Sequence, residues 1–150
     1  MGCEDHVPST LVIASGYFDP QHIGHLEYLE KAKELGDKLV VIVNNDLQAR
    51  QKKGYVFMPQ NERMRMVKAL KPVDETFLSI DENPSVCLSI TAVYRKHAKY
   101  DLYLFAKGGD KFASNIPESQ VCFDYGITIV DHLGEKIQSS SDLVKRISTD

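Results

Sequence analysis

The chain has 150 residues, of which 43% are hydrophobic, enough for one well-buried core, so we expect a single domain over residues 1–150 with a flexible N-terminus at 1–9. Its 18 basic and 21 acidic side chains give a net charge near −3, which argues against a general nucleic-acid or anionic-membrane surface. Three cysteines without CxxC spacing indicate neither disulfides nor a zinc site, and no apolar run suits a signal peptide or membrane span. We therefore expect a cytoplasmic protein with a local functional site.

Apolar, β-rich runs alternate with helical patterns along the chain, and turn residues separate nearly all of them. The run TLVIAS predicts a buried strand, and Leu26, Leu29 and Ala32 follow it at helical spacing before Gly36 ends the helix. In chain order we predict a strand at 10–15, a helix at 24–35, a strand at 38–44, a polar loop around QKKG, a helix at 59–71, a strand at 75–80, a helix that begins at Asn83-Pro84 and reaches 97, a strand at 101–106, the turn KGGD, a helix at 117–125, a strand at 127–131 and a helix at 139–147.

Strands that are apolar on both faces and joined by helices predict a five-stranded parallel sheet with helices on both faces. The predicted fold class is therefore a doubly wound, Rossmann-like α/β fold. Ligands of such sheets bind beyond the carboxyl ends of the strands, where the winding direction reverses. Four polar segments should gather there: SGYFDPQHIGH after the first strand, NND after the second, KGGD after the fourth and GEKIQSSS after the fifth.

Two of the five histidines lie together in the first of these segments. If the helix begins near Ile23, His22 and His25 share its first turn and project to one side, next to backbone N–H groups and the positive end of the helix dipole. Gly16 and Gly24 would let a phosphate approach the backbone closely. A lone histidine at a helix start is usually a surface residue or a cap, but the HxGH pattern after the first strand favours a phosphate-binding site with two imidazole donors.

The segments GYFDPQHIGH and LGDKLVVIVNND closely resemble the cytidylyltransferase family, notably glycerol-3-phosphate cytidylyltransferases and the adenylyltransferase domains that make ADP-heptose. The resemblance covers about residues 10–147. It implies transfer of a nucleoside monophosphate from a nucleoside triphosphate to a phosphorylated or phosphonate small molecule such as glycerol 3-phosphate or a sugar phosphate, with release of pyrophosphate. It also implies a divalent ion, usually Mg²⁺, and a homodimer.

The same resemblance implies roles for individual residues. Its catalytic set is His22, His25, Lys52 and Arg63, with Asp46 and Arg63 at the acceptor. Read alone, Lys52 would belong to a solvated loop and Arg63 to a solvated helix face. The residues implied in nucleotide binding are Gly16, Tyr17, Phe18, Asp19, Gly24, Lys107, Gly108, Gly109, Asp110, Ser139, Ser140 and Ser141, of which the three serines could equally be helix caps.

The sequence departs from the cytidylyltransferase pattern in ways that bear on the nucleotide. The segment LGEKIQSSS lacks the arginine-threonine pair that precedes the last helix in that family, and Lys136 is the candidate replacement for its charge. Gly54 stands where glycerol-phosphate enzymes have a second lysine, whereas KGGD resembles the ADP-heptose group. These departures weaken the assignment of cytosine. On the resemblance as a whole we still expect transfer of CMP from CTP, with ATP as the main competitor.

Two other classes of function stay open. One is a non-catalytic nucleotide-binding module, against which the four catalytic candidates argue. The other is a class I aminoacyl-tRNA synthetase, whose HIGH signature is present, but the chain has no KMSKS-like segment and no basic extension for tRNA. The absence of GxxxxGK[ST] and GxGxxG motifs excludes P-loop kinases and ordinary dinucleotide dehydrogenases.

Overall fold

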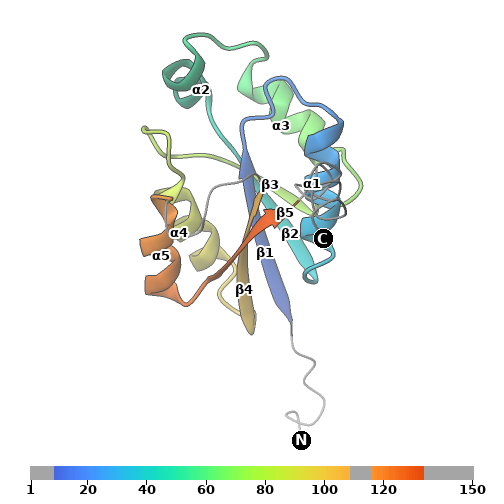
Figure 1. The fold of residues 1–150 in the computed structure, drawn as a ribbon, viewed down its shortest axis with the longest axis vertical. Coiled ribbons are helices and arrows are strands. Elements are labelled where there is room, and N and C mark those ends of the chain that lie inside the picture. Colours follow the sequence, from blue (N-terminus) through green and yellow to red (C-terminus); the bar gives the residue numbers. More distant parts are fainter. Residues whose placement is uncertain (1–8, 109–115, 134–150) are drawn as a thin grey trace, which may run out of the picture.

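We describe the protein from a computed structural model, over residues 9–108 and 116–133. Five parallel strands form one sheet in the order β3-β2-β1-β4-β5 (Figure 1). The chain runs outward from β1 to β3 and then returns to the other side of β1 for β4, so the winding direction reverses between β1 and β4. The strands are β1 (Thr10–Gly16), β2 (Lys38–Val43), β3 (Glu75–Leu78), β4 (Leu102–Gly108) and β5 (Thr128–Leu133). The predicted fold class is confirmed.

Helices cover both faces of the sheet, as Figure 1 shows with α4 and α5 on one side and α1 and α3 on the other. Successive strand side chains point to opposite faces and so enter two separate cores. Leu11 and Ile13 of β1 pack with α4 and α5, whereas Val12 and Ala14 pack with α1 and α3. The helices are α1 (Ile23–Lys33), α2 (Asp46–Lys53), α3 (Gln60–Lys68), α4 (Cys87–Lys96) and α5 (Glu118–Tyr125).

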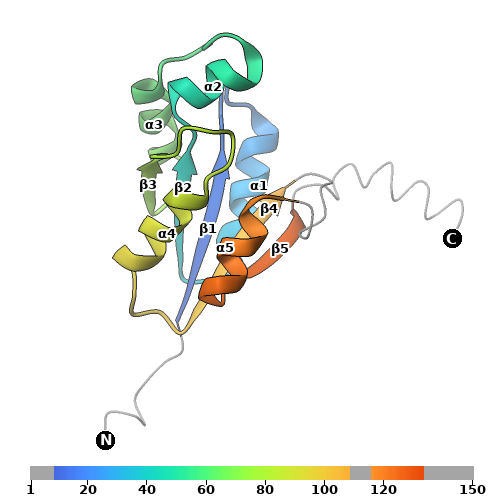
Figure 2. The ribbon, with the colours of Figure 1, turned by 90° about the vertical axis from the view of Figure 1, so that its left-hand side faces the viewer.

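The prediction of a polar loop around QKKG is wrong, because α2 occupies this segment and lies beyond the carboxyl ends of β1 and β2 (Figure 2). The helix carries no strong apolar stripe, and its ends define it instead. The side chain of Asn45 accepts a hydrogen bond from the Gln48 amide at 2.9 Å, and the Gln48 side chain accepts one from the Asn45 amide at 2.9 Å. Gly54, with φ of 87°, then ends the helix in the left-handed region.

The start of α4 also differs from the prediction. Asn83-Pro84 lies in a turn before the helix, where the Asn83 side chain accepts a hydrogen bond from the Ser85 amide at 3.0 Å. The helix itself begins at Cys87, and the Asp81 carboxylate accepts from the amides of Leu88 and Ser89 at 2.8 and 2.9 Å. The loop between β3 and α4 is therefore longer than predicted and approaches the end of β1 where ligands of this fold class bind.

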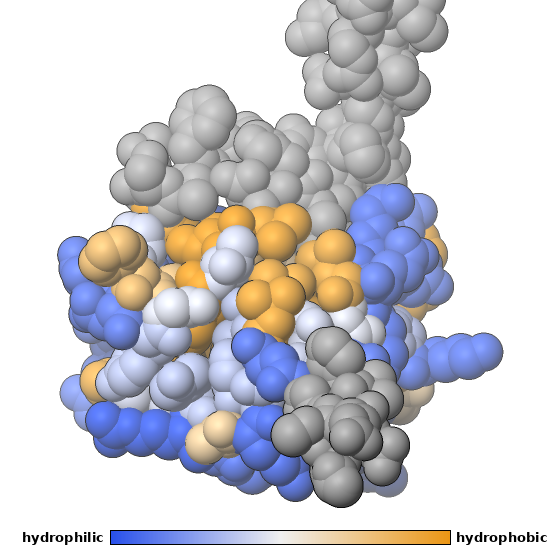
Figure 3. Space-filling model, turned by 90° about the horizontal axis from the view of Figure 1, so that it is seen from below, coloured by the Kyte–Doolittle hydropathy of each residue, from blue (hydrophilic) through white to orange (hydrophobic). Residues whose placement is uncertain are grey.

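Figure 3 shows the opposite end of the molecule, at the amino ends of the strands, where hydrophobic residues gather near the middle of the face and hydrophilic residues lie mostly around them. Leu102, the first residue of β4, is 44% exposed. Within the described ranges, no helix combines the length and the apolar character needed to cross a bilayer. The predicted helix at 139–147 lies outside those ranges, as do residues 1–8 and the second half of the KGGD turn, Gly109 and Asp110; Lys107 and Gly108 belong to β4.

Candidate active site at the carboxyl ends of the strands

The two histidines of the HxGH motif stand side by side at the start of α1. His22 is the N-cap, and its Nδ1 accepts a hydrogen bond from the Gly24 amide at 3.1 Å. The Nδ1 of His25 accepts one from the His22 amide at 3.0 Å, and the two rings stack with centroids 3.8 Å apart. Because each Nδ1 accepts a backbone N–H, the neutral form of each ring carries its proton on Nε2. The turn therefore fixes both tautomers and leaves two Nε2–H donors.

Most backbone amides of this turn are used within it. The amides of His25 and Leu26 donate to the His22 carbonyl at 2.9 and 3.4 Å, and that of Gly24 donates to the His22 ring. At this helix start, the imidazole Nε2–H groups, and not the bonded backbone amides, are therefore the donors that remain for an anion. Partial burial, and secondly the neighbouring His22, lower the pKa of His25 to about 4, so His25 is neutral at pH 7.

The two glycines predicted to admit a phosphate make room for protein side chains. A Cβ on Gly16 would lie 2.9 Å from the Phe18 ring, and a Cβ on Gly24 would lie 3.0 Å from Cε1 of His22. Phe18 is 1% exposed, has φ of 52° and meets the His25 ring edge-on at 5.0 Å between centroids. The first effect of both glycines is therefore to let the motif's own rings pack against the backbone.

Asp19 joins the loop after β1 to the loop after α2. Its carboxylate accepts from Lys53 Nζ at 2.9 Å and from the amides of Phe57 and Met58 at 2.9 and 2.5 Å. Burial alone would raise the pKa of Asp19, but the hydrogen bonds from Lys53 and the two amides outweigh it and lower that pKa. With these partners, the side chain anchors a loop, and its predicted contact with nucleotide stays a prediction.

Arg63 lies in the interior, with a side chain that is 0% exposed. Its guanidinium donates to the carbonyls of Tyr17, Asn44 and Met58 at 2.7 to 2.8 Å and to Asp46 Oδ1 at 2.7 Å. The interpretation of Arg63 as a solvated helix face is therefore wrong, and its buried guanidinium has no contact open to substrate. The Asp46 side chain stays 26% exposed, so its predicted contact with the acceptor stays a prediction. The pair joins the ends of β1 and β2 to the segment before α3.

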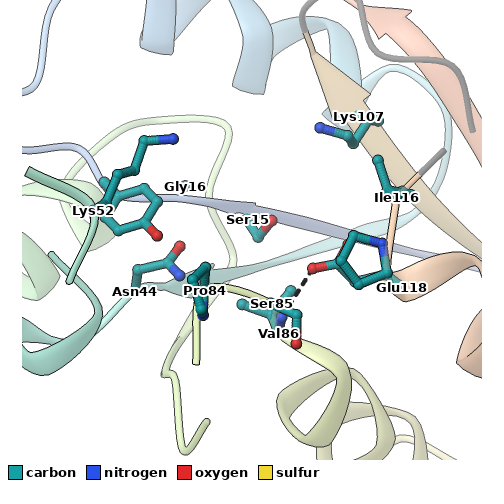
Figure 4. Close-up of a pocket in the computed structure, with 12 residues that line it drawn as sticks. Ser15, Gly16, Asn44, Lys52, Pro84, Ser85, Val86, Lys107, Ile116 and Glu118 are labelled. Carbon is teal, nitrogen blue, oxygen red and sulfur yellow. Dashed lines mark hydrogen bonds between the residues drawn. The ribbon is translucent and has the colours of Figure 1, made fainter. Parts of the chain in front are cut away.

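A polar pocket of about 330 Å³ opens at the carboxyl ends of β1, β2 and β4. Lys52 of α2 lies on one side, with Nζ 5.2 Å from the centroid of the Tyr17 ring, and Lys107 of β4 lies on another (Figure 4). The remaining wall comes from the loop before α4 and the start of α5. The lining residues are Ser15, Gly16, Tyr17, Asn44, Lys52, Pro84, Ser85, Val86, Lys107, Ile116, Pro117 and Glu118.

This pocket brings together only part of the predicted site. Four predicted residues line it, namely Gly16, Tyr17, Lys52 and Lys107, whereas His22 and His25 do not. Gly108 is the last residue of β4. Gly109, Asp110, Ser139, Ser140 and Ser141 lie outside the described residues, as does Lys136.

Sequence reasoning placed Asn44 at this edge within the segment NND but gave it no role, and it missed two polar residues of the pocket, Ser85 and Glu118. Asn44 directly follows β2, so its position at a strand end was a usable signal. Ser85 comes from the loop before α4 and Glu118 from the start of α5, and no local pattern marks them.

Within the described part of the chain, no group of three or more His, Cys, Asp or Glu side chains could hold a metal ion. These residues therefore do not fit a resident metal, and no step below depends on one. The divalent ion implied by the resemblance stays an expectation.

A doubly wound parallel sheet with an HxGH turn opening its first helix defines the class of HxGH nucleotidyltransferases. The family model described as Cytidylyltransferase-like matches residues 13–145, and the chain belongs to this family.

Curated relatives are similar to a shorter region. An FAD synthase of Methanoculleus marisnigri is 49% identical over 67 residues, which cover 45% of this chain and 44% of that protein. An FAD synthase of Ferroglobus placidus is 49% identical over 72 residues, 48% of this chain and 47% of that protein. The matches thus span about half the length of these relatives.

Two solved structures resemble the whole fold more evenly. A lipopolysaccharide core biosynthesis protein from Thermoplasma volcanium has a TM-score of 0.62 at 29% identity, covering 83% of this chain and 94% of that one. A protein of unknown function from Archaeoglobus fulgidus has a TM-score of 0.58 at 21% identity, covering 83% and 90%, and supports the fold alone.

Proposed function

We propose that this protein transfers AMP from ATP to the phosphate of a phosphorylated small molecule and releases pyrophosphate. An oxygen of the acceptor phosphate attacks the α-phosphorus of ATP, a new P–O bond forms, and the bond from the α-phosphorus to the bridging oxygen of pyrophosphate breaks. The observation that carries this proposal is the pair of Nε2–H donors fixed by the first turn of α1. Such donors stabilise the charge that develops on phosphate oxygens in the transition state.

The groups around the pocket suit the acceptor half of this reaction. Lys52 offers a mobile ammonium at the end of β1 next to Tyr17, a position suited to a phosphate. Arg63 donates from the interior to the carbonyls of Tyr17 and Asn44 and so positions these two residues, which line the pocket where the phosphate would bind. No side-chain nucleophile is needed, because in-line transfer depends on orientation and on stabilisation of charge.

The relatives support ATP over the CTP favoured by the sequence analysis. FAD consists of FMN and AMP joined through a pyrophosphate, so the making of FAD from FMN requires transfer of an adenylyl group. The FAD synthase relatives therefore favour ATP as the donor and FMN as the first acceptor to test. CMP transfer from CTP is the second candidate, favoured by the description of the matching family model. A homodimer and a cytoplasmic location stay predictions.

Thermal unfolding with Mg²⁺ and each of ATP, CTP, GTP and UTP tests the choice of nucleotide. At a hundred times its dissociation constant, a ligand adds about 2.7 kcal/mol, which corresponds to a rise in Tm of about 5 to 11 °C for a domain of this size. We expect this rise with ATP. A rise with CTP alone would transfer the proposal to cytidylyl transfer, and no rise with any nucleotide would contradict both.

Pyrophosphate release from ATP and FMN tests the histidines. We expect His22→Ala and His25→Ala each to lower turnover at least about a hundredfold, because each removes a donor aimed at developing charge. Glu30→Ala, at an exposed position of the same helix, serves as the control and should keep normal turnover. Near-normal turnover in both folded histidine variants would refute the catalytic assignment.

A further inference from the structure

The polar pocket contains one carboxylate that the proposed reaction does not use. Glu118 is the first residue of α5 and is only 9% exposed. Its Oε2 accepts a hydrogen bond from the Val86 amide at 2.9 Å, which joins α5 to the loop before α4. Its Oε1 has no hydrogen-bond partner among residues 9–108 and 116–133. Glu118 Oε1 can therefore accept a hydrogen bond from a donor that enters the pocket.

The negative charge of Glu118 acts on the interior of the pocket. Burial, and secondly the Glu118 carboxylate, raise the pKa of Tyr17, which lines the same pocket. Tyr17 belongs to the end of β1, whereas Glu118 approaches from α5, so the two face the cavity from different elements. The charge of Glu118 is therefore felt across the space that a ligand would occupy.

The pocket is polarised by the placement of its charges. In Figure 4, Lys52 of α2 and Glu118 of α5 approach the cavity from opposite sides with Ser15 between them, and Lys107 of β4 lies on the same side as Glu118. An anionic group is favoured beside the ammonium of Lys52, and a hydrogen-bond donor is favoured beside the carboxylate. A second anion beside Glu118 would meet both a like charge and the loss of solvent.

We propose that Glu118 selects the acceptor through the hydrogen-bond donors that the acceptor carries. The pocket takes a phosphomonoester whose phosphate lies beside Lys52 and whose hydroxyl or N–H groups donate to Glu118. The end of the acceptor beside Glu118 carries no second anionic group. This inference rests on the proposed function for the placement of the acceptor in the pocket. It goes further by naming the residue that determines specificity and by excluding phosphomonoesters with an anionic far end.

The test compares two phosphomonoesters of the same skeleton. Glycerol 3-phosphate ends in a CH₂OH group, whereas 3-phosphoglycerate carries a carboxylate there. Binding of both compounds and of FMN to the full chain is measured by titration calorimetry. We expect wild-type protein to bind glycerol 3-phosphate or FMN, and to bind 3-phosphoglycerate about ten- to a hundredfold more weakly than glycerol 3-phosphate, as for loss of a hydrogen bond to a charged group.

Glu118→Gln keeps an oxygen for the Val86 amide, removes the charge and replaces the second oxygen, which accepts from the ligand, with an NH₂ group. We expect it to weaken glycerol 3-phosphate and FMN about tenfold or more, to lessen the penalty on 3-phosphoglycerate and to leave inorganic phosphate within about twofold. A merely structural role would weaken all of them together. Glu62→Gln makes the same charge change in the first turn of α3, at an exposed position, and should change nothing.

Two outcomes would overturn the inference: wild-type affinities in Glu118→Gln, or no binding of either donor-bearing compound to the wild type. The thermal shift with ATP separates this failure from that of the proposed function. If ATP stabilises the protein and FMN is turned over while Glu118→Gln behaves as wild type, the proposed function stands and the selection by Glu118 falls. If no nucleotide stabilises the protein, the proposed function falls first.

Discussion

Replacement of Arg63 by Met should destabilise the fold before it affects chemistry. The methionine keeps most of the apolar volume but removes every hydrogen bond of the guanidinium. Three backbone carbonyls then lose their donor in the interior, and Asp46 loses its ion-pair partner. The carbonyls of Tyr17 and Asn44 belong to the ends of β1 and β2, so the loss falls on the base of the pocket.

The magnitude follows from the burial of the pair. Removal of one partner from a buried, hydrogen-bonded ion pair costs about 3 to 5 kcal/mol, and we expect the low end because the Asp46 side chain is 26% exposed. A loss of about 3 kcal/mol corresponds to a fall in Tm of about 6 to 12 °C for a domain of this size. Thermal unfolding monitored by circular dichroism measures this directly.

Arg65→Met is the matched control, since Arg65 lies on the same helix and is exposed. We expect that variant to change the free energy of unfolding by less than about 0.5 kcal/mol. An Arg63→Met protein that keeps its Tm but loses turnover would refute this reasoning. Such a result would favour the direct contact with substrate that the family resemblance implies.

Three further predictions follow from the loops around the histidines. NMR titration of the His25 ring should give a midpoint near pH 4. The free energy of unfolding should fall as the pH drops from 6.5 towards 4, because in this range only the unfolded chain binds a proton at His25. A midpoint of 6 or above contradicts this prediction. Asp19→Ala should lower the free energy of unfolding in urea by about 1 to 3 kcal/mol at pH 7. Because the pKa of Asp19 is lowered in the folded protein, the difference from wild type should persist above pH 4 and vanish as the pH falls through that folded pKa. A difference that does not change with pH would contradict this. Gly16→Ala should cost about 1 to 3 kcal/mol by forcing Phe18 to move, and an unchanged Tm would show that the ring yields freely.

The sheet could be predicted from the sequence because its signal is local. The strands β1, β2 and β4 are apolar runs whose central residues are buried on both faces, and nothing else in a chain of this composition explains such runs. The helix α2 was missed because its stability comes from its caps, Asn45 with Gln48 and Gly54, and from the hydrogen bonds of Gln48 to the carbonyls of Asn83 and Ser85. The caps could have been recognised in the sequence, whereas contacts 35 and 37 residues away could not.

The candidate site divides in the same way. The histidine pair was predictable because three residues of one helical turn determine it. The burial of Arg63 was not, because its four acceptors come from segments 5 to 46 residues distant, and an isolated arginine on a helix is ordinarily exposed. Glu118 gains its significance only when α5 packs beside the loop before α4, which no local pattern encodes.

Two adjacent lysines illustrate the difference between residues that hold the loops in place and residues that contact the ligand. Lys53 turns inward and pairs with the buried Asp19, while Lys52 is exposed beside the pocket. Arg63 likewise forms an ion pair with Asp46 and donates to backbone carbonyls. Asp46 and Asp19 therefore neutralise the two cations that hold these loops. Substitutions at Lys53, Asp19 or Arg63 should therefore lower Tm and turnover together. Substitutions at Lys52, and Glu118→Gln, which keeps an oxygen for the Val86 amide, should change acceptor affinity at constant Tm. Measurement of both quantities on each variant therefore distinguishes a residue that shapes the site from one that contacts the ligand.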